Sequence, residues 1–511
     1  MTAGAIGTLA RRPAVRHFGP PGLLATALIA IGALGVGWLP PSSEVNGNAA
    51  VELLRTTTAG SLAARALVVI GLAMLLQAWL LLGAHVRHAR TQGPAEAVSP
   101  RDLLALLVTW SVPLLLAPPM FSRDAYSYYV QGRVFASGAD PTLVGVHVIP
   151  GWFDDGADPM WIESPTPYGP LFLLIERSIA TIAHPNAYLG ALLFRLVALA
   201  GLALVAYWLP RLASSVGADP ATAMWLGLVN PLILLHFVAG AHNDALMVGL
   251  VATGLGLACQ NKCIWGAVAI GLAASVKPIA LVALPFVGLL WAGAHSTWGM
   301  RIRSWLMAGL VSLATIVSVL LLAGVGSGVV SATFGTPGGV ITWLSPTTIV
   351  GKSAGYASTW LGWTNDDGPA LALARTAGTL AVLAVIAWLA LTPTRRTPLR
   401  GAALAFAALV AFGPVVQPWY LLWSLPLLAA SGLSERTQRV IILLTAFFTV
   451  HAMIESSTNA DNQFAAADLI TFAVSAAIVL VVIFGSRSER RLIWPADDAG
   501  PHGDQRARMS A

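Results

Sequence analysis

Runs of about 20 apolar residues recur along most of the chain, separated by short polar segments. Each run is long enough to cross a bilayer core of roughly 30 Å as a helix. Backbone polar groups find no water in lipid, and a helix satisfies them within the run. The residue-by-residue alternation of a lipid-facing barrel is not visible in the sequence. The pattern therefore predicts an all-α polytopic membrane protein.

The runs add up to about 14 transmembrane helices, within a range of about 12 to 15. The clearest spans are expected over residues 21–40, 62–84, 103–120, 187–209, 222–240, 305–324 and 371–391, and two more flank the polar turn 455–463. The apolar stretch 169–184 is short and contains Glu176 and Arg177, so we expect an interfacial or partly inserted helix there. Two short runs around Lys277 are expected to form a helical pair with Lys277 at its outer side.

Basic residues mark one side of the predicted membrane, because they gather in alternate connecting segments as in cytoplasmic loops. This pattern places residues 1–20 and 486–511 in the cytoplasm, as tails of a single transmembrane domain over 21–485. It places the acidic segment 121–168 and the Gly-, Ser- and Thr-rich segment 326–370 on the outer face. Long loops without basic residues commonly carry function, so we expect an active site on the outer face.

Composition agrees with the apolar pattern and excludes one class of function. The 511 residues are 56% hydrophobic and 10% charged, whereas soluble domains carry about 25% charged residues. A net charge of +6 is compatible with nucleic-acid binding, but the basic residues lie mostly in the short loops between the apolar runs. No basic stripe with interleaved aromatic residues is present, so we expect no nucleic-acid partner. Cys259 and Cys263 are interpreted as small apolar residues.

The outer segment 121–168 holds the first candidate for catalysis. Asp124 lies within about one helical turn of the end of the third predicted span and is followed by Tyr128. A carboxylate there can accept a proton from a hydroxyl nucleophile, or it can form a structural ion pair with Arg123 or Arg133. Aromatic faces beside carboxylates suit sugar binding. Further candidates in the segment are Asp140, which alternatively caps a turn, Glu163, and Tyr168 in a rigid Pro-rich turn.

Later polar residues at predicted helix ends extend the candidate site. His242, Asn243 and Asp244 can bind sugar hydroxyls, or Asn243 and Asp244 can cap the following helix. Lys277 interrupts an apolar run, and its natural partner near the outer surface is a phosphate, unless the side chain snorkels to the interface.

An outer turn holds the last candidates, Gln417, Trp419 and Tyr420. An interfacial aromatic belt explains Trp419 and Tyr420 equally well.

An ordered set of motifs resembles a known family. The motifs are Phe121-Ser122-Arg123-Asp124-Ala125-Tyr126-Ser127-Tyr128, Gly138-Ala139-Asp140-Pro141, Pro167-Tyr168-Gly169-Pro170-Leu171, Asn230-Pro231, Ala241-His242-Asn243-Asp244-Ala245, Val276-Lys277 and Gln417-Pro418-Trp419-Tyr420. Over roughly residues 20–485 the chain resembles the actinobacterial polyprenol-phosphomannose-dependent α-1,6-mannosyltransferases. One departure is Thr142 after Pro141, where the family often has an aromatic residue.

The resemblance implies a GT-C-type glycosyltransferase fold with its active site at the outer face of the cell membrane. It implies polyprenyl phosphomannose as donor and, as acceptor, an α-1,6-mannan on a phosphatidylinositol mannoside-type lipid, the core of lipomannan and lipoarabinomannan. Membrane lipids would surround the protein. The catalytic role is carried over to Asp124. Whether the chain starts or extends the mannan is left open.

The expected chemistry is a single inverting displacement in which Asp124 accepts the proton of the acceptor hydroxyl. Lys277, His242 or Arg123 could stabilise the leaving phosphate, so no obligatory metal is expected, although paired acids could hold Mg²⁺ or Mn²⁺. Two alternatives are a GT-C transferase for another polyprenyl-phosphate sugar and a transporter or lipid flippase. Transporters usually place ionisable groups near the bilayer midplane, whereas the acids here gather in outer loops.

Overall fold

A computed structural model describes residues 13–92, 97–326, 328–342, 344–393 and 397–455. Helices and connecting turns make up these residues, and no strand occurs among them, which confirms the all-α prediction for this part of the chain. The N-terminal residues 1–12, the predicted turn 455–463, the span after it and the tail 486–511 lie outside the described residues, apart from residue 455 itself.

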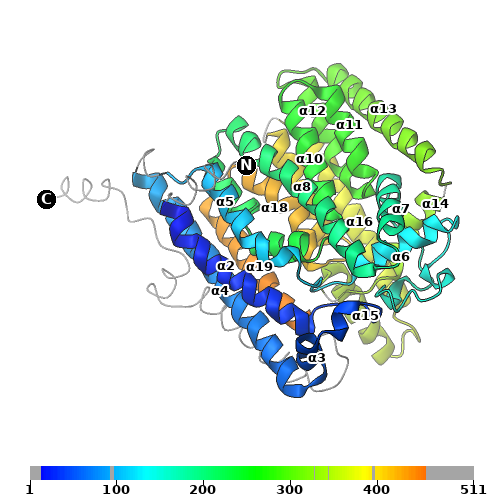
Figure 1. The fold of residues 1–511 in the computed structure, drawn as a ribbon. Coiled ribbons are helices and arrows are strands. Elements are labelled where there is room, and N and C mark those ends of the chain that lie inside the picture. The colour runs from blue at the N-terminus through cyan, green and yellow to red at the C-terminus, as the bar shows by residue number, and fades with distance from the viewer. Residues whose placement is uncertain (1–12, 93–96, 327, 343, 394–396, 456–511) are drawn as a thin grey trace.

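Two long helices form one flank of the molecule, α2 (Pro13–Val36) and α4 (Thr58–Gln92), with the short α3 (Ala49–Thr56) at one end (Figure 1). A Cβ on Gly32 would lie 2.5 Å from the backbone oxygen of Ala64, and one on Gly71 would lie 2.6 Å from that of Ala25. These pairings run in opposite directions along the chain, so α2 and α4 are antiparallel. Small residues permit such close approach between membrane helices.

The predicted span 103–120 is shorter and more irregular in the structure. Helix α5 covers Pro100–Ser111 and a 3₁₀ turn, η2, follows at Val112–Leu115. Pro113 lacks a backbone N–H and interrupts the α-helical hydrogen bonding there. The chain then reaches α6 (Asp124–Ala136) through Phe121, whose φ of 66° lies in the left-handed region.

The stretch 169–184 forms a short helix as predicted, α7 (Pro170–Ala183). The long α8 (Ala187–Ser215) follows it and runs through the middle of the fold (Figure 1). Glu176 of α7 is completely buried.

The predicted span 222–240 is broken in the structure. Helix α9 covers Pro220–Gly227, and a π-helical turn, η5, covers Ile233–Ala239. The break falls at Asn230 and Pro231, because proline cannot donate the helical hydrogen bond. The chain then bends by 109° between η5 and α10 (Asp244–Cys259). This bend brings the polar residues 242–244 to the centre of the fold.

Shorter helices follow, and they include the predicted pair around Lys277. These are α11 (Cys263–Ala274), the 3₁₀ turn η6 (Pro278–Ala283) and α12 (Leu284–Ala292). Helix α13 (Trp298–Ala323) packs against both α11 and α12. Cys259 and Cys263 are free thiols near the start of this region.

The C-terminal part begins with helical structure where a loop rich in Gly, Ser and Thr was expected. Its elements are α14 (Gly328–Gly339), α15 (Pro346–Trp360), α16 (Gly368–Leu391), α17 (Pro398–Phe412), the 3₁₀ turn η8 (Pro418–Tyr420), α18 (Leu421–Ala430) and α19 (Glu435–Glu455). Ser345 caps α15 by accepting a hydrogen bond from the backbone of Thr348, which explains why a helix starts inside this polar segment.

Within the described ranges, five helices are long and apolar enough to cross a membrane, namely α2, α4, α8, α13 and α16. The bent pair η5 and α10 would make six if it counts as one span. Apolar helices of 10 to 17 residues occur as well. The helices fit a polytopic membrane protein, whereas the number of about 14 spans stays a prediction.

Candidate active site

Asp124 occupies the first position of α6. Its backbone N–H donates to Oγ of Ser122 over 3.1 Å, and a carboxylate in the first turn is favoured by the helix dipole. One turn later, the hydroxyl of Tyr128 donates to Oδ2 of Asp124 over 3.3 Å. The side chain of Asp124 is 18% exposed. The carboxylate is therefore fixed from its own helix while it remains accessible.

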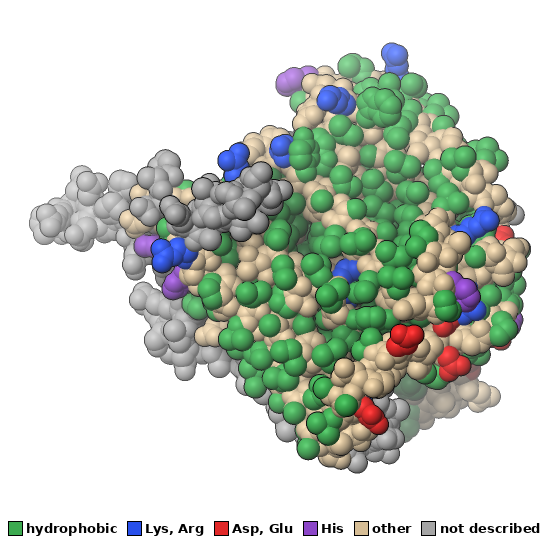
Figure 2. Space-filling model, in the orientation of Figure 1, with side chains coloured by type: hydrophobic (Ala, Val, Ile, Leu, Met, Phe, Trp, Pro, Cys, Tyr) green, Lys and Arg blue, Asp and Glu red, His purple; other side chains and the backbone are tan. Residues whose placement is uncertain are grey.

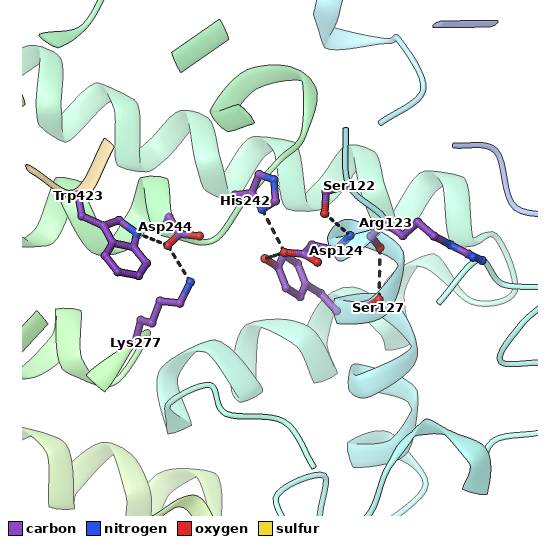
Figure 3. A network of polar contacts seen from close by, with 9 residues as sticks. Ser122, Arg123, Asp124, Ser127, His242, Asp244, Lys277 and Trp423 are labelled. Carbon is purple, nitrogen blue, oxygen red and sulfur yellow. Dashed lines mark hydrogen bonds and ion pairs between the residues drawn. The ribbon is translucent and has the colours of Figure 1, made fainter. Parts of the chain in front are cut away.

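His242 reaches Asp124 from the bend between η5 and α10. Nδ1 of His242 lies 3.2 Å from Oδ2 of Asp124, and the imidazole is completely buried (Figure 3). The ring stacks on the indole of Trp419, with centroids 3.9 Å apart and an angle of 22°. Ala241, just before it, has a φ of 54°, so the chain adopts a strained left-handed turn to place this ring.

Neighbouring groups keep Asp124 ionised. Burial by itself would raise the pKa of its carboxyl, but the contact with His242, the charge of Lys277 and the hydroxyl of Ser122 together outweigh burial, so the pKa lies below its ordinary value. A carboxylate that is ionised and partly exposed has the protonation state that a general base needs.

Lys277 and Asp244 form a second polar pair in the same region. Nζ of Lys277 lies 2.7 Å from Oδ1 of Asp244, and the indole N–H of Trp423 donates to the same oxygen over 2.5 Å. Asp244 opens α10, while Lys277 lies in extended backbone just before Pro278. The ammonium group lies 5.3 Å from the ring centroid of Trp423 and at the same distance from that of Tyr420.

Tyr168 connects the two polar pairs. Its ring packs edge-to-face on Tyr128 at 5.3 Å, and its centroid lies 5.7 Å from Nζ of Lys277. Phe172 of α7 and Phe194 of α8 complete this aromatic wall against Tyr128. Figure 3 shows the group around Asp124 and the group around Asp244 side by side, contributed by segments far apart in the sequence.

The structure thus brings together eight of the thirteen residues singled out from the sequence: Asp124, Tyr128, Tyr168, His242, Asp244, Lys277, Trp419 and Tyr420. It also adds Trp423, which stacks on Tyr420 at 3.8 Å and was not singled out. Trp423 follows Tyr420 by three residues, so the two share one face of a helical turn, and this spacing could have identified Trp423 from the sequence.

Arg123 lies beside Asp124 in the sequence but points away from it (Figure 3). Its Nε donates to the backbone oxygen of Gly156 over 2.9 Å, and the guanidinium lies 4.7 Å from the ring centroid of Trp38. Arg123 thus contacts the segments around Trp38 and Gly156 and does not join the group assembled around Asp124. Arg133 pairs with Asp155 and not with Asp124.

Asp140 and Glu163 also lie outside the assembled group. Oδ1 of Asp140 accepts hydrogen bonds from the backbone N–H and the hydroxyl of Thr142, which matches the turn-capping alternative. The side chain of Glu163 is 76% exposed and lies 3.5 Å from Nδ1 of His147.

Asn243 and Gln417 adjoin the site without a defined contact to it. Asn243 is buried, and within the described residues neither polar atom of its side chain has a hydrogen-bond partner. The side-chain cap that was its alternative role is not formed. Gln417 precedes η8, makes no side-chain capping hydrogen bond there and is half-buried.

Acidic, His and Cys side chains do not gather into a metal-binding cluster in the described part of the chain, since no group of three or more meets there. An apolar groove of about 290 Å³ lies between α7 and α8. It is lined by Leu174, Ile175, Ser178, Ile179, Ile182, Leu193 and Val197.

Comparison with known proteins matches the chain to two consecutive family models. Residues 20–293 match the N-terminal domain of alpha-(1→6)-mannopyranosyltransferases, and residues 347–484 match the MptB C-terminal domain. A probable alpha-(1→6)-mannopyranosyltransferase of Mycolicibacterium smegmatis is 31% identical over 95% of this chain and 92% of its own length.

Relatives of two named types are about equally similar. Alpha-(1→6)-mannopyranosyltransferase A of Mycobacterium tuberculosis is 33% identical over 84% of this chain and 83% of its own length. Alpha-(1→6)-mannopyranosyltransferase B of Corynebacterium glutamicum is 30% identical over 80% of this chain and 72% of its own length. The chain is a glycosyltransferase and belongs to the alpha-(1→6)-mannopyranosyltransferase family.

Proposed function

We propose that this protein transfers mannose from polyprenyl phosphomannose to an α-1,6-mannan chain on a phosphatidylinositol mannoside-type lipid, with inversion at the anomeric carbon. Family membership and the names of the relatives support mannosyl transfer. The observation that carries the proposal is that a partly exposed base, Asp124, and a partly exposed cation, Lys277, lie on either side of one aromatic wall. A base and a phosphate-binding cation are what transfer from a sugar phosphate to a hydroxyl requires.

The reaction has one displacement step. The 6-hydroxyl oxygen of the acceptor bonds to the anomeric carbon, while the bond from that carbon to the phosphate oxygen breaks. The hydroxyl proton passes to Oδ2 or Oδ1 of Asp124, and the polyprenyl phosphate departs with the bonding electrons. His242 and Tyr128 orient the carboxylate through their contacts with Oδ2.

Lys277 binds the phosphate of the donor and stabilises its charge as the bond breaks. Asp244 and Trp423 hold Lys277 in place, because Asp244 pairs with its ammonium group and Trp423 contacts both that group and the Asp244 carboxylate. With a cation supplied by the protein, the leaving group needs no obligatory metal. Stacked aromatic rings at Trp419 and Tyr420 provide faces for the sugar.

The proposal also places the site on the outer face of the cell membrane, with both termini in the cytoplasm. In Figure 2 a broad hydrophobic surface crosses the middle, most acidic side chains of this view lie toward the lower right, and several basic ones appear at the top and left, while others lie on the right near the acidic ones. Basic residues are favoured at the cytoplasmic side. A site on the outer face has no access to cytoplasmic nucleotide sugars, so a lipid-linked donor is the consistent choice.

The groove between α7 and α8 suits the lipid part of such a donor. Its lining is largely apolar, and Phe172 and Phe194, which contact Tyr128, belong to the same two helices. A polyprenyl chain in this groove would bring its phosphate toward the aromatic wall, where Lys277 lies.

The deciding experiment is a membrane assay with radiolabelled polyprenyl phosphomannose and a short α-1,6-mannoside acceptor. We expect label in a product one mannose longer, with an α-linkage. Transfer from polyprenyl phosphoglucose or polyprenyl phosphoarabinose alone would instead establish the other-sugar alternative. Movement of the labelled lipid across the membrane without any glycosidic product would establish a transporter or flippase.

A further inference from the structure

We propose that Arg195 of α8 is a positioning residue that sets the distance between Asp124 and the residues of the bend at His242. Arg195 is 1% exposed and does not contact any of the residues assembled around Lys277 through a hydrogen bond. Its action is therefore exerted through the backbone segments that carry the site. This inference rests on the proposed role of Asp124.

The guanidinium binds two separate stretches of chain. Its Nε donates to the carbonyl of Val238 over 2.8 Å, and Nη2 donates to that of Ala239 over 2.8 Å. On the other side, Nη2 donates to the carbonyl of Ala117 over 2.9 Å and Nη1 to that of Leu115 over 2.5 Å. One side chain thus joins the end of η2 to the end of η5.

Both stretches lead directly to site residues. Ala117 precedes Asp124 by seven residues, and Ala239 precedes His242 by three. Between each anchor and its site residue the backbone is irregular, with left-handed turns at Phe121 and Ala241. No continuous helix connects either anchor to its site residue, so the contact through Arg195 helps to fix the separation of the two stretches.

The chemistry of the contact fits this role. Carbonyl groups at the end of a helical turn lack an intrahelical partner and carry partial negative charge. A guanidinium has five donors in a rigid fork and keeps its charge, so it can satisfy several such carbonyls at once. Tyr188 of the same helix adds a further bond, from its hydroxyl to the carbonyl of Leu116 over 2.5 Å. A buried cation is costly inside a membrane protein and marks function by default.

The test compares Arg195→Lys and Arg195→Met with Arg211→Lys. Arg211 lies on the same helix and donates to the carbonyl of Tyr207 in its own helix, so its replacement controls for a changed arginine in α8. We expect Arg195→Lys to lower kcat on the order of 10²-fold, because small misplacements of catalytic groups cost that much. Donor KM should stay within about twofold of the unaltered enzyme, since Lys277 is unchanged. Arg211→Lys should leave both constants unchanged.

Hydrogen exchange supplies a readout that does not depend on activity. In Arg195→Met, backbone amides of 115–124 and 238–244 should exchange faster, while those of α2 and α4 should not. Unchanged kcat and unchanged exchange in both variants would overturn the inference. So would faster exchange throughout the protein in both, since that would show only a general structural role. If Asp124→Asn were fully active while exchange rose locally in Arg195→Met, the proposed role of Asp124 would fail and the backbone linkage would stand.

Discussion

Oδ2 of Asp124 and Nδ1 of His242 lie 3.2 Å apart, although one residue begins α6 and the other lies in the bend before α10. Trp419, from a third segment, stacks on the imidazole at 3.9 Å and holds it against the carboxylate. The contact joins three segments that run separately through the fold. It is also the place where the proposed proton transfer occurs.

Replacing Asp124 by Asn should abolish most turnover while leaving membrane insertion intact. Asn has nearly the same shape but cannot accept the proton, and general-base catalysis contributes about 10²–10⁴-fold. The measurement is the initial rate of labelled mannose transfer at saturating donor, together with the amount of folded protein in the membrane. Asp140→Asn is the matched control, because Asp140 only caps a turn in the structure. Wild-type rates in Asp124→Asn would remove the residue from its role.

Replacing Lys277 by Ala should weaken use of the donor. A hydrogen bond to a charged group is worth about 1.5–3 kcal/mol, so donor KM should rise roughly 10- to 100-fold. Removal of Lys277 also leaves the buried Asp244 carboxylate without its counter-charge, so the double variant Lys277→Ala, Asp244→Asn should restore stability but not donor use. Lys352→Ala is the control, since Lys352 forms a similar pair with Asp367 away from the site. An unchanged dependence on donor concentration would contradict a phosphate contact.

Filling the groove between α7 and α8 should reduce use of long-chain donors. Val197 lines the groove, whereas its neighbour Leu196 does not and is 60% exposed. We expect Val197→Trp to raise the KM for a long polyprenyl donor several-fold and to leave a short-chain donor almost unaffected, while Leu196→Trp changes neither. Each buried methylene is worth about 0.8 kcal/mol, so loss of several contacts is measurable. Equal effects of the two Trp variants would assign the polyprenyl chain to another surface.

Glu176→Gln should stabilise the protein above mildly acidic pH. Burial raises the pKa of the Glu176 carboxyl well above its ordinary value, and neither oxygen has a hydrogen-bond partner in the described residues. The pKa of this carboxyl is higher in the folded than in the unfolded protein. The free energy of unfolding therefore falls by about 1.4 kcal/mol for each pH unit as the pH rises from the unfolded pKa, about 4.3, to the folded pKa. The melting temperature of Glu176→Gln should therefore exceed that of the wild type at neutral pH and converge with it near pH 4.

The control for this prediction is Glu163→Gln, because the side chain of Glu163 is 76% exposed. It should give no pH-dependent difference in melting temperature. A constant difference between Glu176→Gln and the wild type at every pH would show that the carboxyl is not the cause.

Treatment with EDTA should leave mannosyl transfer unchanged, because the proposed mechanism assigns the phosphate to Lys277. The measurement is the initial rate before and after chelation, and again after addition of Mg²⁺ or Mn²⁺. Loss of activity that either ion restores would require a metal in the mechanism and would favour the alternative that paired outer acids bind one.

The sequence alone was sufficient to predict a helical membrane protein, because lipid forces every apolar run of this length to satisfy its own backbone. Family motifs in the sequence singled out Asp124, His242, Asp244 and Lys277 as members of one ordered set. The helix expected over 169–184 is present as α7. These features are local in the chain or depend on the order of short motifs, so residue types suffice to find them.

Only the tertiary structure showed which of these side chains meet. The continuous span expected over 222–240 breaks at Pro231 and bends by 109° before α10, and that bend carries His242 to Asp124. Arg123, adjacent to Asp124 in the sequence, points toward Trp38 instead. The direction of a side chain and the distance between two segments depend on packing among helices that are distant in the sequence. The hydrophobic pattern shows that a residue is apolar, but it does not show which neighbour that residue will contact.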